Sequence, residues 1–140
     1  MLATIDEVII ELENIKAECR TNNSTLGFFA LLYCEVTKNV KKGIADKNFE
    51  DNSRMETLDI LFANRYIDAY HANQKNEKVS QSWQVAFQSS KEPLLILQHI
   101  LFGINAHINL DLGIAAAETM AGKNVEEIKK DFNSNDCTLL

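Results

Sequence analysis

Two stretches of this sequence combine carboxylates with histidines at helical spacing. His107 and Asp111 are four residues apart, whereas Asp68 and His71 are three apart, with Arg65 just upstream. Residues three or four apart share one face of an α-helix. An acid and a histidine on each of two facing helices can complete the shell of one divalent metal ion, such as zinc or iron. The predicted metal ligands are Asp68, His71, His107 and Asp111.

Three interpretations of this cluster follow from the residue types. In a metal-dependent hydrolase, His107, Asp111 and Arg65 would be catalytic. The same side chains could perform acid–base chemistry without a metal. Alternatively, they form a structural network in which Asp111 pairs with His107 or Arg65, and the protein is a non-enzymatic binding or interaction module. An enzyme requires an open pocket at His107 and Asp111, while a structural network predicts a closed, hydrogen-bonded cluster.

A second polar set lies on the same segment as His107. Gln98, Asn105 and Asn109 fall within about 40° of one another on a helical wheel, and His99 lies nearby. We expect these side chains to belong to the polar site. His99 and His107 are separated by roughly 12 Å along an unbroken helix, so they cannot share one metal ion unless the helix breaks, for example at Gly103.

Helices must position all of these groups, because apolar residues recur at helical spacing nearly throughout and strand alternation is absent. The segment 94–117 is apolar on every side of its wheel, which predicts a buried central helix. We therefore expect a single all-α domain over residues 1–140, a bundle of about six helices around that segment. The expected helices cover residues 4–21, 24–42, 53–73, 80–89, 93–120 and 124–132, with capping boxes at Thr4–Glu7 and Ser53–Glu56.

Composition narrows the function classes. The net charge of −6 and a pI of about 5.0 argue against nucleic-acid binding. Polar residues within 94–117 argue against a membrane span. The three cysteines, Cys19, Cys34 and Cys137, fit neither a disulfide framework nor a zinc ribbon, so a cytoplasmic protein is expected. The expected partner is a small molecule or another protein, and the sequence is compatible with an oligomer.

The segment from His99 to Gly113, HILFGINAHINLDLG, resembles the signature of a family of uncharacterised, mainly bacterial all-helical proteins. The stretches LFANRYIDAY from Leu61 and SWQVAF from Ser82 are also similar to that family, so the resemblance runs from about residue 24 to 133. It implies an all-α fold and no established activity. Similar proteins continue past Asp131 into further helix, so a C-terminal truncation is expected here. The motif positions are Arg65, Asp68, Trp83, His99, Asn105, His107, Asn109 and Asp111.

Overall fold

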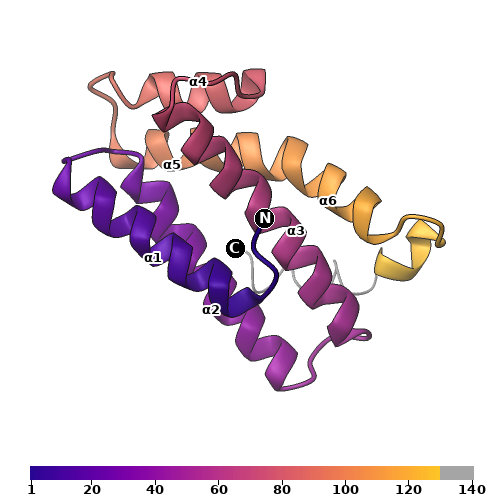
Figure 1. The fold of residues 1–140 in the computed structure, drawn as a ribbon. Helices are drawn as coiled ribbons and strands as arrows, with labels where there is room; N and C mark the ends of the chain where they lie inside the picture. The colour runs from indigo at the N-terminus through magenta and orange to yellow at the C-terminus, as the bar shows by residue number, and fades with distance from the viewer. Residues whose placement is uncertain (130–140) are drawn as a thin grey trace.

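The structure is a computed structural model that describes residues 1–129, and the described residues form helices and no strand (Figure 1). The all-α prediction is confirmed. The elements are α1 (Ile5–Thr21), α2 (Gly27–Ala45), α3 (Asn52–Gln74), α4 (Gln81–Ser89), α5 (Ile96–Ala106), the π-helix η1 (His107–Asp111), α6 (Leu112–Thr119) and a 3₁₀ turn (Val125–Ile128). The last part of the expected helix 124–132 and the expected truncation lie outside the described residues.

Local sequence sets where the helices begin. The predicted capping box of α1 is present, because the Thr4 hydroxyl accepts the Glu7 N–H and the Glu7 carboxylate accepts the Thr4 N–H. The capping box predicted at Ser53 is wrong. Helix α3 begins one residue earlier, and the Asp51 carboxylate accepts the Arg54 N–H at 2.9 Å. Aspartate caps a helix as well as serine does. The Asp51 carboxylate satisfies a backbone N–H of the first turn that has no partner within the helix.

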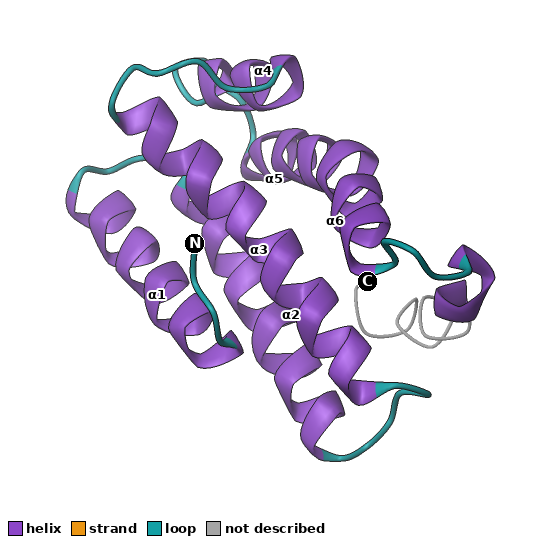
Figure 2. Ribbon diagram, turned by 45° about the vertical axis from the view of Figure 1, so that its right-hand side comes forward, coloured by secondary structure: helices purple, strands orange, loops and turns teal. Residues whose placement is uncertain are grey.

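The helices pack in layers, with α2 and α3 between α1 on one side and the α5–η1–α6 segment on the other (Figure 2). Helix α1 packs against α2 and α3, α5 packs against α2 and α4, and α6 packs against α3. Helix α4 covers one end of this arrangement (Figure 1). The core between the layers is rich in aromatic side chains, namely Phe29, Tyr33, Phe62, Tyr66, Tyr70, Trp83 and Phe87.

The prediction of a buried central helix is wrong. The segment Ile96–Thr119 is one continuous helix, but it lies at the edge of the bundle. Only 28% of its most apolar 18-residue stretch is buried. Leu97, Leu101 and Ile108 are 63%, 52% and 39% exposed. By length and composition this helix could span a bilayer, as could the apolar core helix of a soluble protein. An all-round apolar wheel does not reveal whether a neighbour covers each side.

The inner face of α5 approaches α2 closely at a glycine. A Cβ built on Gly103 would lie 2.5 Å from two ring carbons of Phe29, so the backbone of α5 contacts this ring directly. Phe29 in turn packs edge-on against Tyr66 and Trp83. Gly103 therefore sets the distance between α2 and α5, rather than breaking the helix as an alternative reading of the sequence suggested.

Gly103→Ala is expected to destabilise the protein by roughly 1–3 kcal/mol, because the added methyl must displace the Phe29 ring. Gly113→Ala is the matched control. It lies in the same helix with nothing within 4 Å of its Cβ, so alanine should be neutral or stabilising by up to about 1 kcal/mol. Urea denaturation of both variants measures the difference, and equal midpoints would contradict the close contact.

Candidate functional site

The carboxylate of Asp111 is the centre of the candidate site. It is 1% exposed and accepts three hydrogen bonds from three different elements. Arg65 Nε of α3 donates to Oδ1 at 3.0 Å. Trp83 Nε1 of α4 donates to Oδ2 at 2.7 Å, and His107 Nδ1 donates to the same oxygen at 3.1 Å. Both oxygens are therefore occupied, and the Asp111 charge is balanced by the Arg65 guanidinium.

His107 is enclosed by aromatic rings. Its imidazole stacks on Phe62, with ring centroids 3.6 Å apart and planes 7° apart. Tyr33 packs edge-on at 4.5 Å, and Trp83 and Tyr66 lie within 6.0 Å. The other ring nitrogen, Nε2, has no hydrogen-bond partner among the described residues. A buried nitrogen in that state is costly, so this atom is the chemically unsatisfied point of the cluster.

Burial sets the charge states of the pair. It lowers the pKa of His107 to about 4, against the opposing effect of the nearby Asp111 carboxylate. Burial alone would raise the pKa of Asp111, but the hydrogen bonds from His107, Trp83 and Arg65 outweigh it and lower that pKa. At neutral pH the histidine is therefore neutral, with its hydrogen on Nδ1 and a free lone pair on Nε2, while the aspartate is ionised.

The π-helix η1 directs both side chains inward. Its characteristic bond joins the Leu112 N–H to the His107 carbonyl, five residues apart. His107 and Asp111 are the two buried residues of this π turn, so both lie on the inner side of the helix. Sequence spacing predicted their shared face, but it contained no sign of the π turn.

The structure does not bring the predicted metal quartet together. Asp68 is exposed, and His71 Nε2 contacts Glu11 Oε1 of α1 at 2.7 Å. The reason lies on α3: Asn64 exchanges hydrogen bonds with the backbone of Leu2, which turns the stripe of Asn64, Asp68 and His71 toward the N-terminal segment and α1. Arg65, on the adjacent face, is the only α3 residue of the predicted sites that reaches Asp111.

The second predicted polar set is divided between inside and outside. His99 is buried beside Phe28, with ring centroids 6.4 Å apart. Gln98 is exposed and accepts the Leu95 N–H at the start of α5. Asn105 and Asn109 are also exposed and bond to each other at 2.5 Å. These amides therefore cap a helix or face solvent and lie apart from the cluster at Asp111.

Sequence reasoning missed a second buried acid, Asp59 of α3. It is 6% exposed, and its Oδ2 has no partner among the described residues. Burial raises its pKa from 3.8 to about 7. Asp59 also acts electrostatically on Tyr33, whose own buried hydroxyl has no partner in residues 1–129. The available signal was periodicity, since Asp59 continues the buried stripe of Met55, Phe62 and Tyr66.

The site is closed. His107 and Asp111 are each 1% exposed, and neither lines the three cavities described among residues 1–129. A cavity of about 20 Å³ shares Phe29, Tyr66 and Trp83 with the wall around His107 and is also lined by His99. That volume suits one water molecule rather than a substrate. The arrangement is thus a closed hydrogen-bonded network with one unsatisfied imidazole nitrogen.

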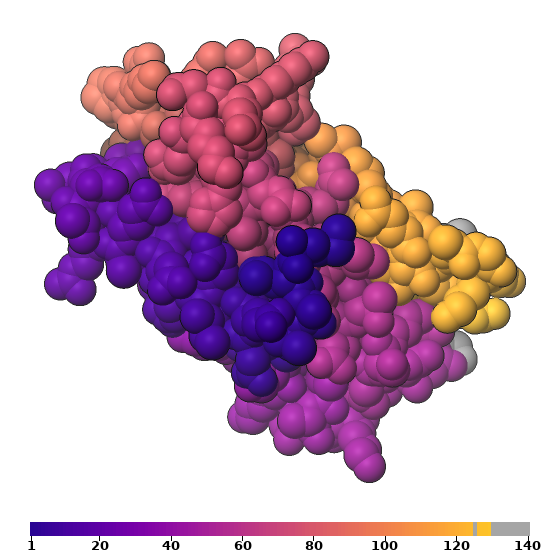
Figure 3. Space-filling view, in the orientation of Figure 1, coloured from indigo at the N-terminus to yellow at the C-terminus, as the bar shows by residue number. Residues whose placement is uncertain are grey.

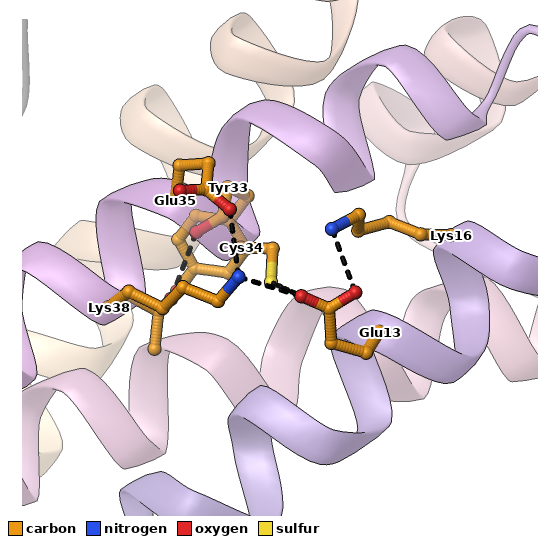
Figure 4. Close-up of polar contacts among 7 residues, drawn as sticks. Glu13, Lys16, Tyr33, Cys34, Glu35 and Lys38 are labelled. Carbon is orange, nitrogen blue, oxygen red and sulfur yellow. Dashed lines mark hydrogen bonds and ion pairs between the residues drawn. The ribbon is translucent and has the colours of Figure 1, made fainter.

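A separate polar cluster joins α1 to α2 (Figure 4). The ligand atoms of Glu13, Cys34 and Glu35 lie within 4.8 Å of one another, the one such group of potential metal ligands in residues 1–129. However, Lys16 and Lys38 occupy the two Glu13 oxygens at 2.8 and 2.7 Å and lower the pKa of Glu13 to about 2. Burial raises the pKa of the Cys34 thiol, which donates to Glu13. With cations already in place, this cluster is an ion-pair network.

Residues 5–139 match the family described as "Family of unknown function (DUF5995)", and the chain belongs to that family. No curated protein and no solved structure matches the chain. Membership is consistent with the predicted resemblance to an uncharacterised family. The description of the family names no activity.

A double-mutant cycle tests which α3 residue contacts Asp111. Arg65→Met and Asp111→Asn should be coupled by roughly 0.5–3 kcal/mol, since they remove the two ends of one partly buried ion pair. His71→Ala and Asp111→Asn provide the control, and their effects should add within about 0.3–0.5 kcal/mol. Unfolding free energies of the single and double variants supply both numbers. Strong coupling to His71 would restore the predicted metal quartet.

The buried Asp59 predicts a pH-dependent stability difference. Its folded-state pKa exceeds the unfolded value, so its contribution to stability falls as pH rises from about 4 to 7. Asp59→Asn should therefore gain stability relative to wild type across that window, by roughly 4 kcal/mol at most. Asp68→Asn removes an exposed acid on the same helix and is the control for the loss of one carboxylate. Urea midpoints at pH 4, 5, 6, 7 and 8 test this, and parallel curves for wild type and Asp59→Asn would contradict it.

Proposed function

We propose that this protein is a non-enzymatic interaction module that presents the outer face of the α5–η1–α6 helix to another protein. The observation that carries the proposal is the exposure of large apolar side chains on that helix. Leu95, Ile96, Leu97, Leu101 and Ile108 are between 39% and 74% exposed. Contiguous exposed apolar surface on a folded protein marks an interaction site more often than an inert surface.

The polar cluster supports the same proposal. In a structural network the buried carboxylate is expected to accept hydrogen bonds through both of its oxygens. Asp111 does so, with three donors. These bonds hold the helix to α3 and α4 through its inner side, so the apolar residues on its outer side contribute little to the fold. The cluster thus acts as the anchor of the helix, and the opposite face remains available for a partner.

Two further points favour a protein over a bilayer or a nucleic acid as the partner. Residues 93–117 include no Lys or Arg, whereas helices that lie on anionic membranes or bind phosphates carry basic residues beside the apolar face. The helix is also tied to the globular part through Asp111, Arg65 and Trp83. Inserting it into lipid would break these bonds and strand the Arg65 charge.

Site-specific photo-crosslinking in cells tests the proposal. A photoreactive phenylalanine analogue in place of Leu101 should give protein adducts, while the same residue at Ile10 of α1, which is 61% exposed, should not. Adducts at neither position, or equally at both, would contradict a protein-binding face on α5. The mass of the adduct shows whether the partner is this chain or another protein.

A second candidate, a hydrolase with a divalent metal such as zinc or iron, is favoured by one observation, the free Nε2 of buried His107. Of the quartet, only this nitrogen and the already occupied Asp111 carboxylate lie at the site. Elemental analysis of protein purified without chelator separates the two proposals. Stoichiometric zinc or iron that is lost in His107→Gln, with the fold retained, would support the metal site and count against a purely structural network.

A further inference from the structure

The cavity of about 20 Å³ lies where four helices meet, since α2, α3, α4 and α5 each contribute residues to its wall. Helix α4 forms the top of the molecule in Figure 3 and covers this end of the bundle. Most of the wall is aromatic or aliphatic. Besides Trp83, whose indole N–H already bonds to Asp111, the wall has three residues with polar side-chain atoms, namely Thr25, Tyr66 and His99.

Two of these polar side chains are buried without a partner. Tyr66 is 1% exposed and His99 is 7% exposed, and neither side chain makes a hydrogen bond to another of residues 1–129. The Nε2 atom of His107 is fully enclosed, whereas the polar atoms of Tyr66 and His99 border space that a water molecule can reach. An unsatisfied buried hydroxyl or imidazole costs free energy, so a group that bonds to both is expected in the cavity.

Thr25 supplies a third polar atom at the cavity. Its hydroxyl donates to the Ser90 carbonyl at 3.1 Å, and a hydroxyl oxygen that donates one bond can still accept another. Thr25 precedes α2 and Ser90 follows α4, so this bond already connects the start of one helix to the end of the other. A molecule bonded to Thr25, Tyr66 and His99 therefore links all the elements around the cavity.

The size and the charge of the cavity select water as its ligand. A bound water needs roughly 10–15 Å³ or more of such space and about two to four polar partners, and this cavity meets both conditions. No Asp, Glu, Lys or Arg lines it, so an ion would be buried there without a counter-charge, at a high cost. Burial raises the pKa of Tyr66 well above its usual value, so its hydroxyl stays protonated and can donate to a water oxygen.

We infer that one water molecule is bound in this cavity, where it joins His99 of α5 to Tyr66 of α3 and to Thr25 at the start of α2. The water makes His99 a second polar attachment of the long helix to the bundle. The first attachment, Asp111, lies twelve residues further on, or roughly 18 Å along the helix. Both attachments are on the inner side, so this site does not depend on which molecule binds the outer face, and crosslinking from Leu101 is a separate readout.

A crystal structure of the protein at a resolution that shows ordered waters tests the site directly. We expect one peak of density in the cavity, at about 2.5–3.2 Å from the Tyr66 hydroxyl and from a ring nitrogen of His99. A cavity without density overturns the inference. A direct Tyr66–His99 hydrogen bond that closes the cavity overturns it as well, and so does a peak whose anomalous scattering identifies chloride or a metal ion.

Urea denaturation gives an independent test in solution. Tyr66→Phe keeps the ring in the core and removes only the hydroxyl, so its midpoint should fall if that hydroxyl is bonded to water. A midpoint that rises means that the hydroxyl faces a dry cavity, and it overturns the inference.

A double-mutant cycle identifies the shared water, because Tyr66 and His99 make no direct hydrogen bond. The midpoint shifts of Tyr66→Phe and His99→Leu should not add, since each variant removes a partner of the same molecule. Tyr70→Phe is the matched control, because the Tyr70 hydroxyl contacts Cys19 Sγ at 3.4 Å and Tyr70 does not line the cavity. Its shift should add to that of His99→Leu. Additive shifts for Tyr66→Phe and His99→Leu would overturn the shared water.

Discussion

The buried carboxylate of Asp111 is the constraint on which the rest of this structure depends. A charge that is 1% exposed is tolerated only when it is paired and hydrogen-bonded. Its three donors come from α3, α4 and η1, which are far apart in the sequence and otherwise meet through aromatic packing. Because the two Asp111 oxygens bond to donors on all three elements, these bonds fix how the elements are oriented toward one another. Loss of any partner leaves a stranded charge rather than one missing contact.

This constraint explains the unusual distribution of residues on the long helix. Its inner side carries His99, His107 and Asp111 together with the small residues Gly103, Ala106 and Ala115, while Leu97, Leu101 and Ile108 are exposed. The small residues allow close approach to Phe29 and to α3, and Asp111 accepts hydrogen bonds from Arg65 and Trp83. The π turn makes both requirements compatible, because it lets His107 and Asp111 point inward together. The large apolar side chains of Leu97, Leu101 and Ile108 remain outside as a consequence.

Two buried titratable groups, His107 and Asp59, have opposite effects on how the stability of the fold depends on pH. Burial keeps His107 neutral and holds a proton on Asp59 up to about pH 7. Between about pH 4 and 6.5 the two groups act in opposite directions, since unfolding lets His107 bind a proton and lets Asp59 release one. Their effects on the pH dependence of stability therefore partly cancel in that range. Above it, only the Asp59 contribution continues to change.

The sequence by itself determined the helical class, the Thr4 cap and the pairing of His107 with Asp111, because these depend on contacts within one helix, where spacing fixes geometry. It also indicated Arg65 as a partner of Asp111. Only the tertiary structure decided that Asp68 and His71 face α1, that Trp83 donates to Asp111, that Asp59 is buried and that the helix 96–119 lies at an edge. Each depends on which element covers which face, and a wheel drawn for one helix contains no information about its neighbours.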